Sequence, residues 1–406
     1  MTPLLATGKR LGAAMAILLL AGIAWREIAL RGPIELGLDQ EEYLAAGAAA
    51  FERGLFFWKA PLYSLWLAPF HAVWGGDLTR YAAMEKAVSV LLFALAMGEL
   101  CRRLVDGRTG LLAVFWVLQC KYLLNEPNNS HTLTAILIAA SALCLTLRSE
   151  AARFPVALFA LFLSCLVRSE MRSVLGAFPV LTAAGAAWER RQRATPFEFT
   201  AAKGAAWAAC LLLALSLCTF FQIRRDKDDH YDLIEEAFTQ NFAANYVERN
   251  GLQAEYPSPW KSCHEIRRRA MPDAPTIGEA IRRHPAEVGA HIRYNIAISL
   301  RAIPASVLGI ARRGLWGLVA LAYLASYLLW RPSAIGWQRL SDGQRRRLIA
   351  LSLSLGALVL TTWFFRAAAR YYIQLIPALL PMLLIGLHLG VLRGLRTDDQ
   401  RHSSGV

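Results

Sequence analysis

The sequence predicts an all-α integral membrane protein, a polytopic bundle of about 10–11 transmembrane helices with amphipathic helices and a helical extramembrane loop on its outer face. Hydrophobic residues make up 56% of the 406 residues and charged residues only 18%, whereas soluble domains hold about 25% charged residues. The apolar residues gather in repeated runs close to the roughly 20 residues that cross a bilayer. Lys and Arg gather in the short loops between these runs, as the positive-inside rule expects.

Ten apolar runs are predicted membrane spans, the fifth of them short. They cover residues 11–27, 80–101, 109–124, 131–147, 154–167, 173–188, 204–222, 314–330, 347–365 and 371–392. The first is interpreted as an uncleaved helix, because it lacks the small-residue cleavage site of a signal peptide. Residues 293–310 space apolar side chains at helical intervals, but Arg293 and Arg301 interrupt them. This pattern favours an amphipathic helix at the membrane surface over an eleventh span.

Charge predicts the orientation of these spans. The loops assigned to the inner side carry 19 Lys and Arg against seven Asp and Glu, and they are residues 1–10, 102–109, 148–153, 189–203, 331–347 and 393–406. Both termini are therefore expected on the cytoplasmic side, in a bacterial inner membrane. The formal net charge of +14 has the same explanation and does not indicate a nucleic-acid partner.

Three parts are expected along the chain. Residues 1–222 form an N-terminal transmembrane module that includes a first outer loop, residues 28–79. Residues 223–292 form an extramembrane, periplasmic loop domain with short helical patterns, such as DLIEEAFTQNFAANYVERN and TIGEAIRRHPAEVGAHI. Residues 293–406 add the surface helix and the C-terminal transmembrane helices.

Cysteine and histidine spacing gives little support to a metal site. The seven cysteines are scattered without a CxxC pair, and the histidines form no HxxxH or HExxH pattern. A disulfide framework is not predicted either. A divalent metal is therefore not favoured, although His131 follows Glu126 closely enough in the sequence to join it in a metal site.

Three carboxylates, Asp39, Glu41 and Glu42, follow the first apolar run at once. Asp39 and Glu42 fit the D-x-x-E pattern of a helix start, in which Asp accepts a backbone N–H and Glu reaches back. Under this structural interpretation, Asp39 and Glu42 have no catalytic role. The alternative is a carboxylate placed at the membrane interface to take a proton.

The next stretch, GLFFWKAPLYSLW, places Lys59 in an aromatic, apolar surface. Aromatic residues of this kind are typical of a membrane-interface loop. Lys59 either extends its charge to the interface from an apolar stem or binds an anion at the depth of the lipid phosphates.

The motifs DQEEY (residues 39–43) and KAPLY (residues 59–63), between two apolar helices, resemble the GT-C glycosyltransferases. The resemblance is greatest to the family 39 group of protein mannosyltransferases and lipid A aminoarabinose transferases. That group usually reads D-E-x-x-Y and K/H-P-P-L-Y, so Gln40 and Ala60 depart from it. Gln40 in place of Glu weakens a metal-binding version of the site.

Later segments extend the resemblance over residues 1–190 and, more weakly, over 345–392. LLNEPNNSHTL resembles the second outer loop of the family and contributes Glu126. VRSEMRS resembles the stretch after the fifth helix and contributes Arg168 and Glu170. RAAARYYIQLIP resembles a late R-Y-x-x-x-x-x-P pattern and contributes Arg370 and Tyr371.

The resemblance implies an inverting glycosyltransferase that uses a polyprenyl-phosphate sugar at the periplasmic face, with residues 1–222 as its catalytic module. Asp39 is then the candidate base for the acceptor, and Glu126 a second catalytic candidate. Cations are needed where the departing phosphate gathers charge. The candidates are Lys59, Arg168 and Arg370, and the rest of the expected site is Glu42, Tyr43, Tyr63, Glu170 and Tyr371. No cofactor is required, and the partners are the donor, a lipid, glycan or protein acceptor, and membrane lipids.

Structural interpretations stay open for several of these residues. Arg168 and Glu170 could pair with each other or with lipid headgroups, Arg366 or Arg370 could extend to the interface, and Glu126, next to Pro127, could be solvated. Alternative functions are a lipid-glycan ligase or polymerase with the same kind of donor, and a non-enzymatic transporter or flippase of lipid-linked sugars. A transporter would need charged residues in mid-span and broken helices, whereas most charges here fall at span ends.

Overall fold

Every element formed by the described residues is a helix, in a computed structural model of the chain. The described residues are 16, 18–26, 28–29, 43–45, 47–48, 61–74, 77–125, 129–147, 149–193, 205, 208–209, 212–213, 215–216, 233–308, 335–386 and 389. The all-α class predicted from the hydrophobic periodicity is confirmed for this part of the chain.

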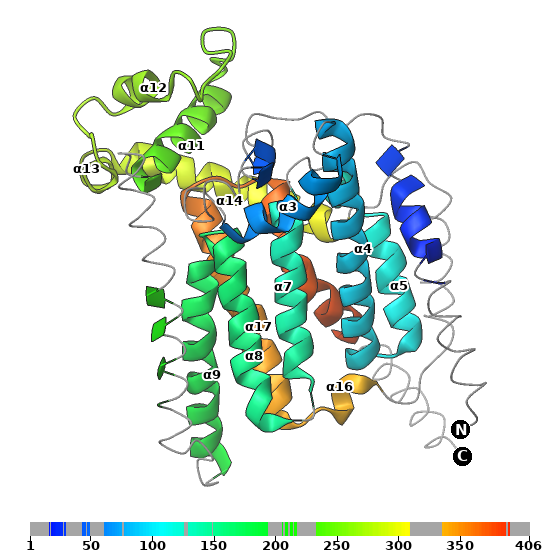
Figure 1. Cartoon of the computed structure of the whole chain (residues 1–406). Coiled ribbons are helices and arrows are strands. Elements are labelled where there is room, and N and C mark those ends of the chain that lie inside the picture. Colours follow the sequence, from blue (N-terminus) through cyan, green and yellow to red (C-terminus); the bar gives the residue numbers. More distant parts are fainter. Residues whose placement is uncertain are drawn as a thin grey trace, which may run out of the picture.

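The main body is a bundle whose long helices run along one common direction (Figure 1). It contains α3 (Pro61–Trp74), α4 (Leu78–Leu104), α5 (Gly107–Leu118), α6 (Lys121–Asn125), α7 (Ser130–Leu145), α8 (Glu150–Val167), α9 (Met171–Arg193), α16 (Gly336–Arg339), α17 (Asp342–Phe364) and the 3₁₀ helix η1 (Ala369–Leu375). One core cluster joins these helices except α3 and buries Phe93 of α4, Leu161 of α8, Phe178 of α9 and Leu355 of α17, whereas α3 packs in a second, smaller core.

A smaller group of helices lies at one end of the bundle (Figure 1). It consists of α11 (Leu233–Asn250), α12 (Cys263–Ala270), α13 (Ile277–Arg283) and the first part of α14 (Pro285–Leu308), which crosses that end. Phe238 and Phe242 of α11 form its core, and Phe364 and Phe365 at the end of α17 pack against that core. The aromatic residues at the end of α17 therefore attach the outer helices to the bundle. We call α11, α12 and α13 the outer domain.

Polar residues mark where several helices begin. Asp77 caps α4 by accepting the backbone N–H of Arg80 at 3.0 Å, and Asp106 caps α5 by accepting that of Thr109 at 2.8 Å. Such caps satisfy N–H groups that have no partner within the helix. They place the breaks between the helices at polar turns.

One described helix, Asp342–Phe364, is long and apolar enough to cross a membrane. Shorter apolar helices cover Gly107–Leu118, Ser130–Leu145, Arg153–Val167 and Arg370–Gly386. The span predicted at 11–27 is described in part, the span at 204–222 lies largely outside the described residues, and the span at 314–330 lies wholly outside them. The number of membrane spans therefore stays a prediction.

The prediction of one helix over residues 109–124 is wrong. The chain forms α5 and α6 with a break at Gln119 and Cys120. Trp116 Nε1 donates to the carbonyl of Val307 at 2.8 Å, and Cys120 Sγ contacts that of Ser306 at 3.4 Å. These carbonyls lie in the last turn of α14 and lack partners within that helix. Hydrophobic periodicity does not detect the break, because both α5 and α6 are buried against the same core.

Two further helix predictions differ in detail from the structure. The pattern TIGEAIRRHPAEVGAHI forms two helices, because α13 ends before His284 and α14 begins at Pro285, where a proline fits the first turn. The helix α14 then continues through the boundary expected at residues 292 and 293. The predicted run 371–392 begins as the 3₁₀ helix η1. The pattern in DLIEEAFTQNFAANYVERN is confirmed as α11.

Loops assigned to the inner side meet at the end of the bundle away from the outer domain (Figure 1). Arg103 Nη1 donates to Thr146 Oγ1 at 3.1 Å. Gln344 Nε2 donates to the carbonyl of Leu147 at 3.3 Å, and the backbone N–H of Gly336 donates to the carbonyl of Val105 at 2.8 Å. Loops that are far apart in the sequence therefore share one end of the molecule.

The helices α4 and α5 approach most closely where Gly98 and Gly110 face each other. A Cβ on Gly110 would lie 2.7 Å from the carbonyl oxygen of Gly98 and 2.9 Å from Arg102 Cβ. Backbone atoms cannot move aside as the end of a side chain can. Glycine at both positions is therefore required by the packing of this helix pair.

The substitution Gly110→Ala should destabilise the protein by about 1–3 kcal/mol, because the added methyl forces the two helices apart. The matched control is Gly176→Ala in α9, where a Cβ would meet no atom within 4 Å. There, alanine should stabilise the helix by about 0.5–1 kcal/mol. Thermal unfolding of the purified variants, followed by circular dichroism, measures both effects. A Gly110→Ala variant as stable as the control would contradict the close packing.

Candidate functional site

Arg168 lies at the centre of the candidate site. It follows the last residue of α8, where extended backbone directs the chain away from the helix. Its Nε donates to Glu170 Oε1 at 2.7 Å, and its Nη1 donates to Ser130 Oγ at 3.4 Å. The side chains of Arg168 and Glu170 are only 16% and 17% exposed. The pairing of these two residues, which the sequence left open, is therefore present, in a largely buried position.

Tyr371 of η1 joins a second arginine to the first. The guanidinium carbon of Arg168 lies 5.7 Å from the centre of the Tyr371 ring, and that of Arg370 lies 5.4 Å from it. His131 contacts the same ring edge-on, with 5.0 Å between the ring centres. Two cations that are about 200 residues apart in the sequence thus share one aromatic ring.

Arg366 extends this cationic group towards the outer domain. It interacts electrostatically with Arg370 and Tyr371, and with Glu248 of α11. Its guanidinium carbon lies 4.6 Å from the ring of Trp260. We call Arg168, Arg366 and Arg370, together with Tyr371, the arginine cluster.

Two expected tyrosines reach the same place. The rings of Tyr43 and Tyr63 lie edge to face with 5.2 Å between their centres. Tyr43 interacts electrostatically with Arg168. Tyr63 is fully buried and packs with Leu44, in a small core that also holds Val167 at the end of α8. The structure therefore brings together the predicted residues from α3, the α8–α9 turn and η1.

Four predicted site residues lie outside the described part of the chain. They are Asp39, Glu42, Lys59 and Glu126. The candidate base and one of the three candidate phosphate-binding cations therefore stay predictions from sequence. Tyr43 follows Asp39 by four positions and is the described residue nearest to it in the sequence.

Glu85 is a buried carboxylate that sequence reasoning missed. It is fully buried in α4 and accepts hydrogen bonds from Trp66 Nε1 at 2.9 Å, from Ser89 Oγ at 2.8 Å and from Asn129 Nδ2. Ser130, the residue after Asn129, is the one that Arg168 contacts. Glu85 therefore fixes the start of α7, which forms one wall of the site. An acidic residue inside the apolar run of α4 was the available signal.

His131 has a structural role in the described contacts. It is buried, and its Nδ1 accepts a hydrogen bond from Gln374 Nε2 at 2.9 Å. This bond and the ring contact with Tyr371 hold η1 against α7. The alternative in which His131 joins Glu126 in a metal site stays a prediction, because Glu126 lies outside the described residues. Among the described residues, the group that could hold a metal is Glu236, Cys263 and His264, in the outer domain.

Asn295 of α14 orders the backbone that leads into the arginine cluster. Its Nδ2 donates to the carbonyl of Trp363 at 2.9 Å and to that of Phe365 at 3.3 Å. Its Oδ1 accepts the backbone N–H of Ala367 at 3.1 Å and Asn245 Nδ2 at 2.9 Å. One buried side chain therefore satisfies backbone groups on both sides of the turn that follows α17.

His291 completes this network one turn earlier on α14. Its Nε2 donates to the carbonyl of Phe364 at 2.9 Å, and its Nδ1 accepts from Asn245 Nδ2 at 3.1 Å. Both bonds fit a neutral imidazole with its proton on Nε2. Burial opposes protonation and lowers the pKa of His291 to about 4. The residues 363–367 are thus held by α11 and α14 together.

Comparison of the chain with protein-family models, with curated proteins and with solved structures finds no match.

Protonation of His291 should destabilise the protein in acid. Because the pKa in the folded state, about 4, is below the ordinary value of 6.5, the folded state binds the proton less readily than the unfolded state does. The stability contributed by the neutral form is complete above pH 6.5 and is lost as pH falls towards 4, by about 3 kcal/mol. Urea unfolding at a series of pH values should show a smaller loss for His291→Gln than for the wild type. The variant His284→Gln, outside the network, is the control; equal pH dependence in all three proteins would contradict this role of His291.

Proposed function

We propose that this chain is a polytopic membrane glycosyltransferase of the GT-C type that transfers a sugar from a polyprenyl phosphate at the outer face of the membrane. The observation that carries the proposal is the arginine cluster, in which Arg168, Arg370 and Tyr371, selected from separate motifs, lie together. Three further features of the structure support it. They are the apolar surface of the bundle, the arrangement of its loops and the chemistry of the buried cations.

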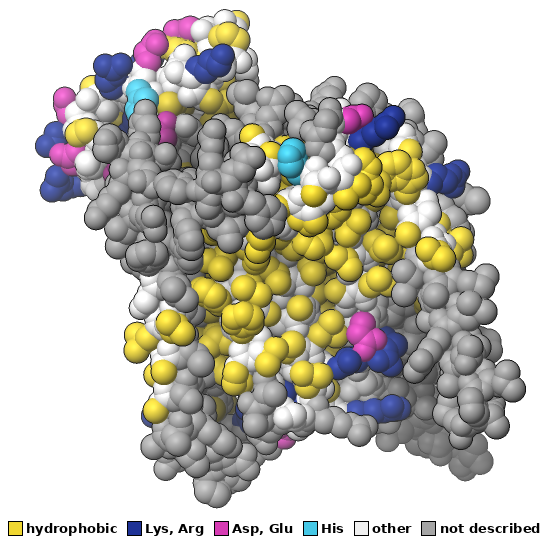
Figure 2. Space-filling view, in the orientation of Figure 1, with side chains coloured by type: hydrophobic (Ala, Val, Ile, Leu, Met, Phe, Trp, Pro, Cys, Tyr) yellow, Lys and Arg dark blue, Asp and Glu magenta, His cyan; other side chains and the backbone are white. Residues whose placement is uncertain are grey.

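The surface of the bundle supports a membrane environment. Figure 2 shows hydrophobic side chains across the middle of the bundle face, with charged side chains towards the two ends. Large apolar side chains are exposed on several helices, including Phe159 of α8, Val180 of α9, and Leu353 and Leu360 of α17. Soluble proteins rarely expose so extended an apolar patch. A bilayer around the bundle would remove this surface from water.

The distribution of loops supports the proposed orientation. The inner loops around Arg103, Leu147 and Gln344 meet at one end of the bundle. The arginine cluster and the outer domain lie at the other end, where α8 and α17 finish and α7 begins. A lipid-linked donor keeps its phosphate at the membrane interface, and that is the depth at which the arginine cluster would lie.

The chemistry of the cluster suits a phosphate ligand. Arginine presents a planar fork of N–H donors that matches phosphate oxygens, and it stays charged when it is buried. Glu170 holds one edge of Arg168, and the Tyr371 ring contacts both Arg168 and Arg370. Fixed cations of this kind stabilise the negative charge that forms on a leaving phosphate.

In the proposed reaction, an acceptor hydroxyl attacks C1 of the sugar opposite the phosphate. The new C1–O bond forms as the bond from C1 to the phosphate oxygen breaks, and its electron pair leaves with the polyprenyl phosphate. Asp39 takes the proton of the acceptor. Arg168 and Arg370, with Lys59, neutralise the phosphate that leaves. No redox step and no cofactor enters this scheme.

The substitution Arg168→Ala should lower the turnover of polyprenyl-phosphate sugar by about 10²–10³-fold, as for the loss of one group that stabilises charge in a transition state. The assay supplies the purified protein in lipid nanodiscs with a panel of polyprenyl-phosphate sugars and acceptors, and detects released polyprenyl phosphate. Two controls separate function from folding: Glu170→Gln breaks the ion pair but keeps the cation, and Arg80→Ala removes an exposed arginine that pairs with Asp77.

Undiminished turnover in Arg168→Ala would refute the phosphate-binding role of this residue. Movement of labelled lipid across vesicles without release of polyprenyl phosphate would instead favour a flippase.

The substitution Asp39→Asn should reduce transfer by about 10²–10⁴-fold, because the base that takes the acceptor proton is lost while the shape of the side chain is kept. Donor binding, measured by quenching of a fluorescent donor analogue, should stay as in the wild type. A purified Asp39→Asn protein that turns over at the wild-type rate would show that Asp39 is not the base.

A further inference from the structure

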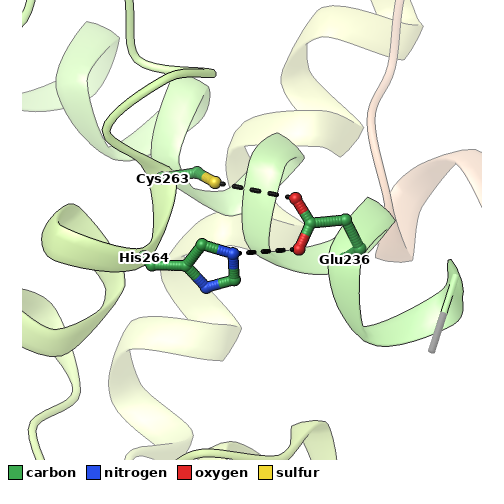
Figure 3. A group of neighbouring side chains, drawn as sticks. All are labelled: Glu236, Cys263 and His264. Carbon is green, nitrogen blue, oxygen red and sulfur yellow. Dashed lines mark hydrogen bonds and ion pairs between the residues drawn. The ribbon is translucent and has the colours of Figure 1, made fainter. Parts of the chain in front are cut away.

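Glu236, Cys263 and His264 form a compact group in the outer domain. Figure 3 shows that the side chains of Cys263 and His264, from the first turn of α12, both point towards the carboxylate of Glu236 on α11. His264 Nε2 lies 3.0 Å from Glu236 Oε2, and Cys263 Sγ lies 3.9 Å from Glu236 Oε1. The three ligand atoms lie within 4.8 Å of one another. The group is on different helices from the arginine cluster and has no part in the proposed transfer.

The neighbouring carboxylate already has a structural role. Glu235 accepts from Arg267 Nη1 at 3.2 Å and from the backbone N–H of Ile277 at 2.7 Å. It therefore joins α11 to α12 and to the start of α13. The next residue, Glu236, makes separate contacts with the start of α12.

Glu236 is itself held in place. Gln240, one turn later on α11, donates from Nε2 to Glu236 Oε1 at 2.8 Å. Carboxylates that bind metals are commonly oriented by hydrogen bonds of this kind. The orientation of the Glu236 carboxylate is therefore fixed from within α11.

The spacing and the donor set fit one class of ion. Bonds of about 2.0–2.3 Å to a tetrahedral zinc ion place its ligand atoms roughly 3.3–3.8 Å apart. The separations found here, 3.0 Å from His264 Nε2 to Glu236 Oε2 and 3.9 Å from Cys263 Sγ to Glu236 Oε1, lie on either side of this range. A thiolate, an imidazole and a carboxylate together favour Zn²⁺ over Mg²⁺ or Ca²⁺, which prefer oxygen ligands only.

Access and burial also fit a metal site. The thiol of Cys263 belongs to a residue that is only 3% exposed, whereas the side chain of His264 is 65% exposed. A metal could therefore enter from the side of His264, and the buried sulfur would be protected from solvent.

We propose that Glu236, Cys263 and His264 bind one Zn²⁺ ion, with water as the fourth ligand, and that the ion cross-links α11 and α12. On binding, the thiol of Cys263 releases its proton and coordinates as a thiolate. The ion stabilises the outer domain, because it binds the folded chain and not the unfolded one.

The test uses the full-length protein, freed of any affinity tag and of metal by a chelator. Cobalt(II) is added as a spectroscopic probe and zinc by calorimetric titration. The wild type should bind one equivalent of either ion, and cobalt should give the near-ultraviolet charge-transfer band of a cobalt–thiolate bond. Zinc should raise the unfolding temperature.

Matched variants assign the ligands. Cys263→Ser should abolish the charge-transfer band, and His264→Gln should weaken zinc binding by at least about 10–100-fold, the range seen when a group that only orients a ligand is lost. The variants Cys144→Ser and His284→Gln, which change the same residue types elsewhere, should behave as the wild type. Because His264 is exposed, its substitution decides the matter even if Cys263→Ser folds poorly.

Absence of the charge-transfer band in the wild type would overturn the proposal. So would equal zinc affinity in the wild type and His264→Gln. In either case the three residues form an ion pair with a neighbouring thiol and no metal site. Neither result would bear on the transferase, whose assay depends on Arg168 and Asp39.

Discussion

Carbonyl groups at a helix end that is buried in protein need hydrogen-bond donors from elsewhere, and this requirement determines how the outer end of the molecule is built. Asn295 and His291 of α14 donate hydrogen bonds to the last carbonyls of α17. Asn245 of α11 in turn donates a hydrogen bond to Asn295. A buried carbonyl that accepts no hydrogen bond destabilises the folded state by roughly 1–3 kcal/mol. The same requirement applies at the end of α14, where Trp116 and Cys120 donate to the carbonyls of Val307 and Ser306. The outer domain is thus joined to the bundle by polar contacts at helix ends, with aromatic packing around them.

The arginine cluster depends on these contacts. Residues 366–368 follow α17 without regular secondary structure, and the bond from the N–H of Ala367 to Asn295 fixes their course. The 3₁₀ helix η1 then carries Arg370 and Tyr371 to Arg168, and His131 and Gln374 secure its far side. Two positive groups are kept close together only because a rigid backbone holds each of them. Rigid placement of charge is what the stabilisation of a leaving phosphate requires.

Local sequence signals predicted much of this structure. The helical period and the polar turns predicted the all-helical class and the position of α11. The order of the motifs selected four residues that the structure brings together, namely Arg168, Glu170, Arg370 and Tyr371. The break at Gln119 was missed because its cause is α14, almost 190 positions later. The roles of Asn295 and Glu85 were missed for the same reason, because a lone polar residue in a helix does not reveal its partner. Glu236 is 27 positions from Cys263, so no short metal-binding motif exists to be recognised.

The buried carboxylate of Glu85 has a consequence for the mobility of the wall that Ser130 provides. Trp66, Ser89 and Asn129 tie α3, α4 and the start of α7 to this one group. If the first turn of α7 tilted alone, Glu85 would lose the hydrogen bond from Asn129, and water could not replace it because Glu85 is buried. The energy cost of this loss would suppress thermal motion of that turn. The shape of this wall is therefore set before any ligand binds. Selectivity at this wall would come from the exclusion of molecules whose shape does not match it.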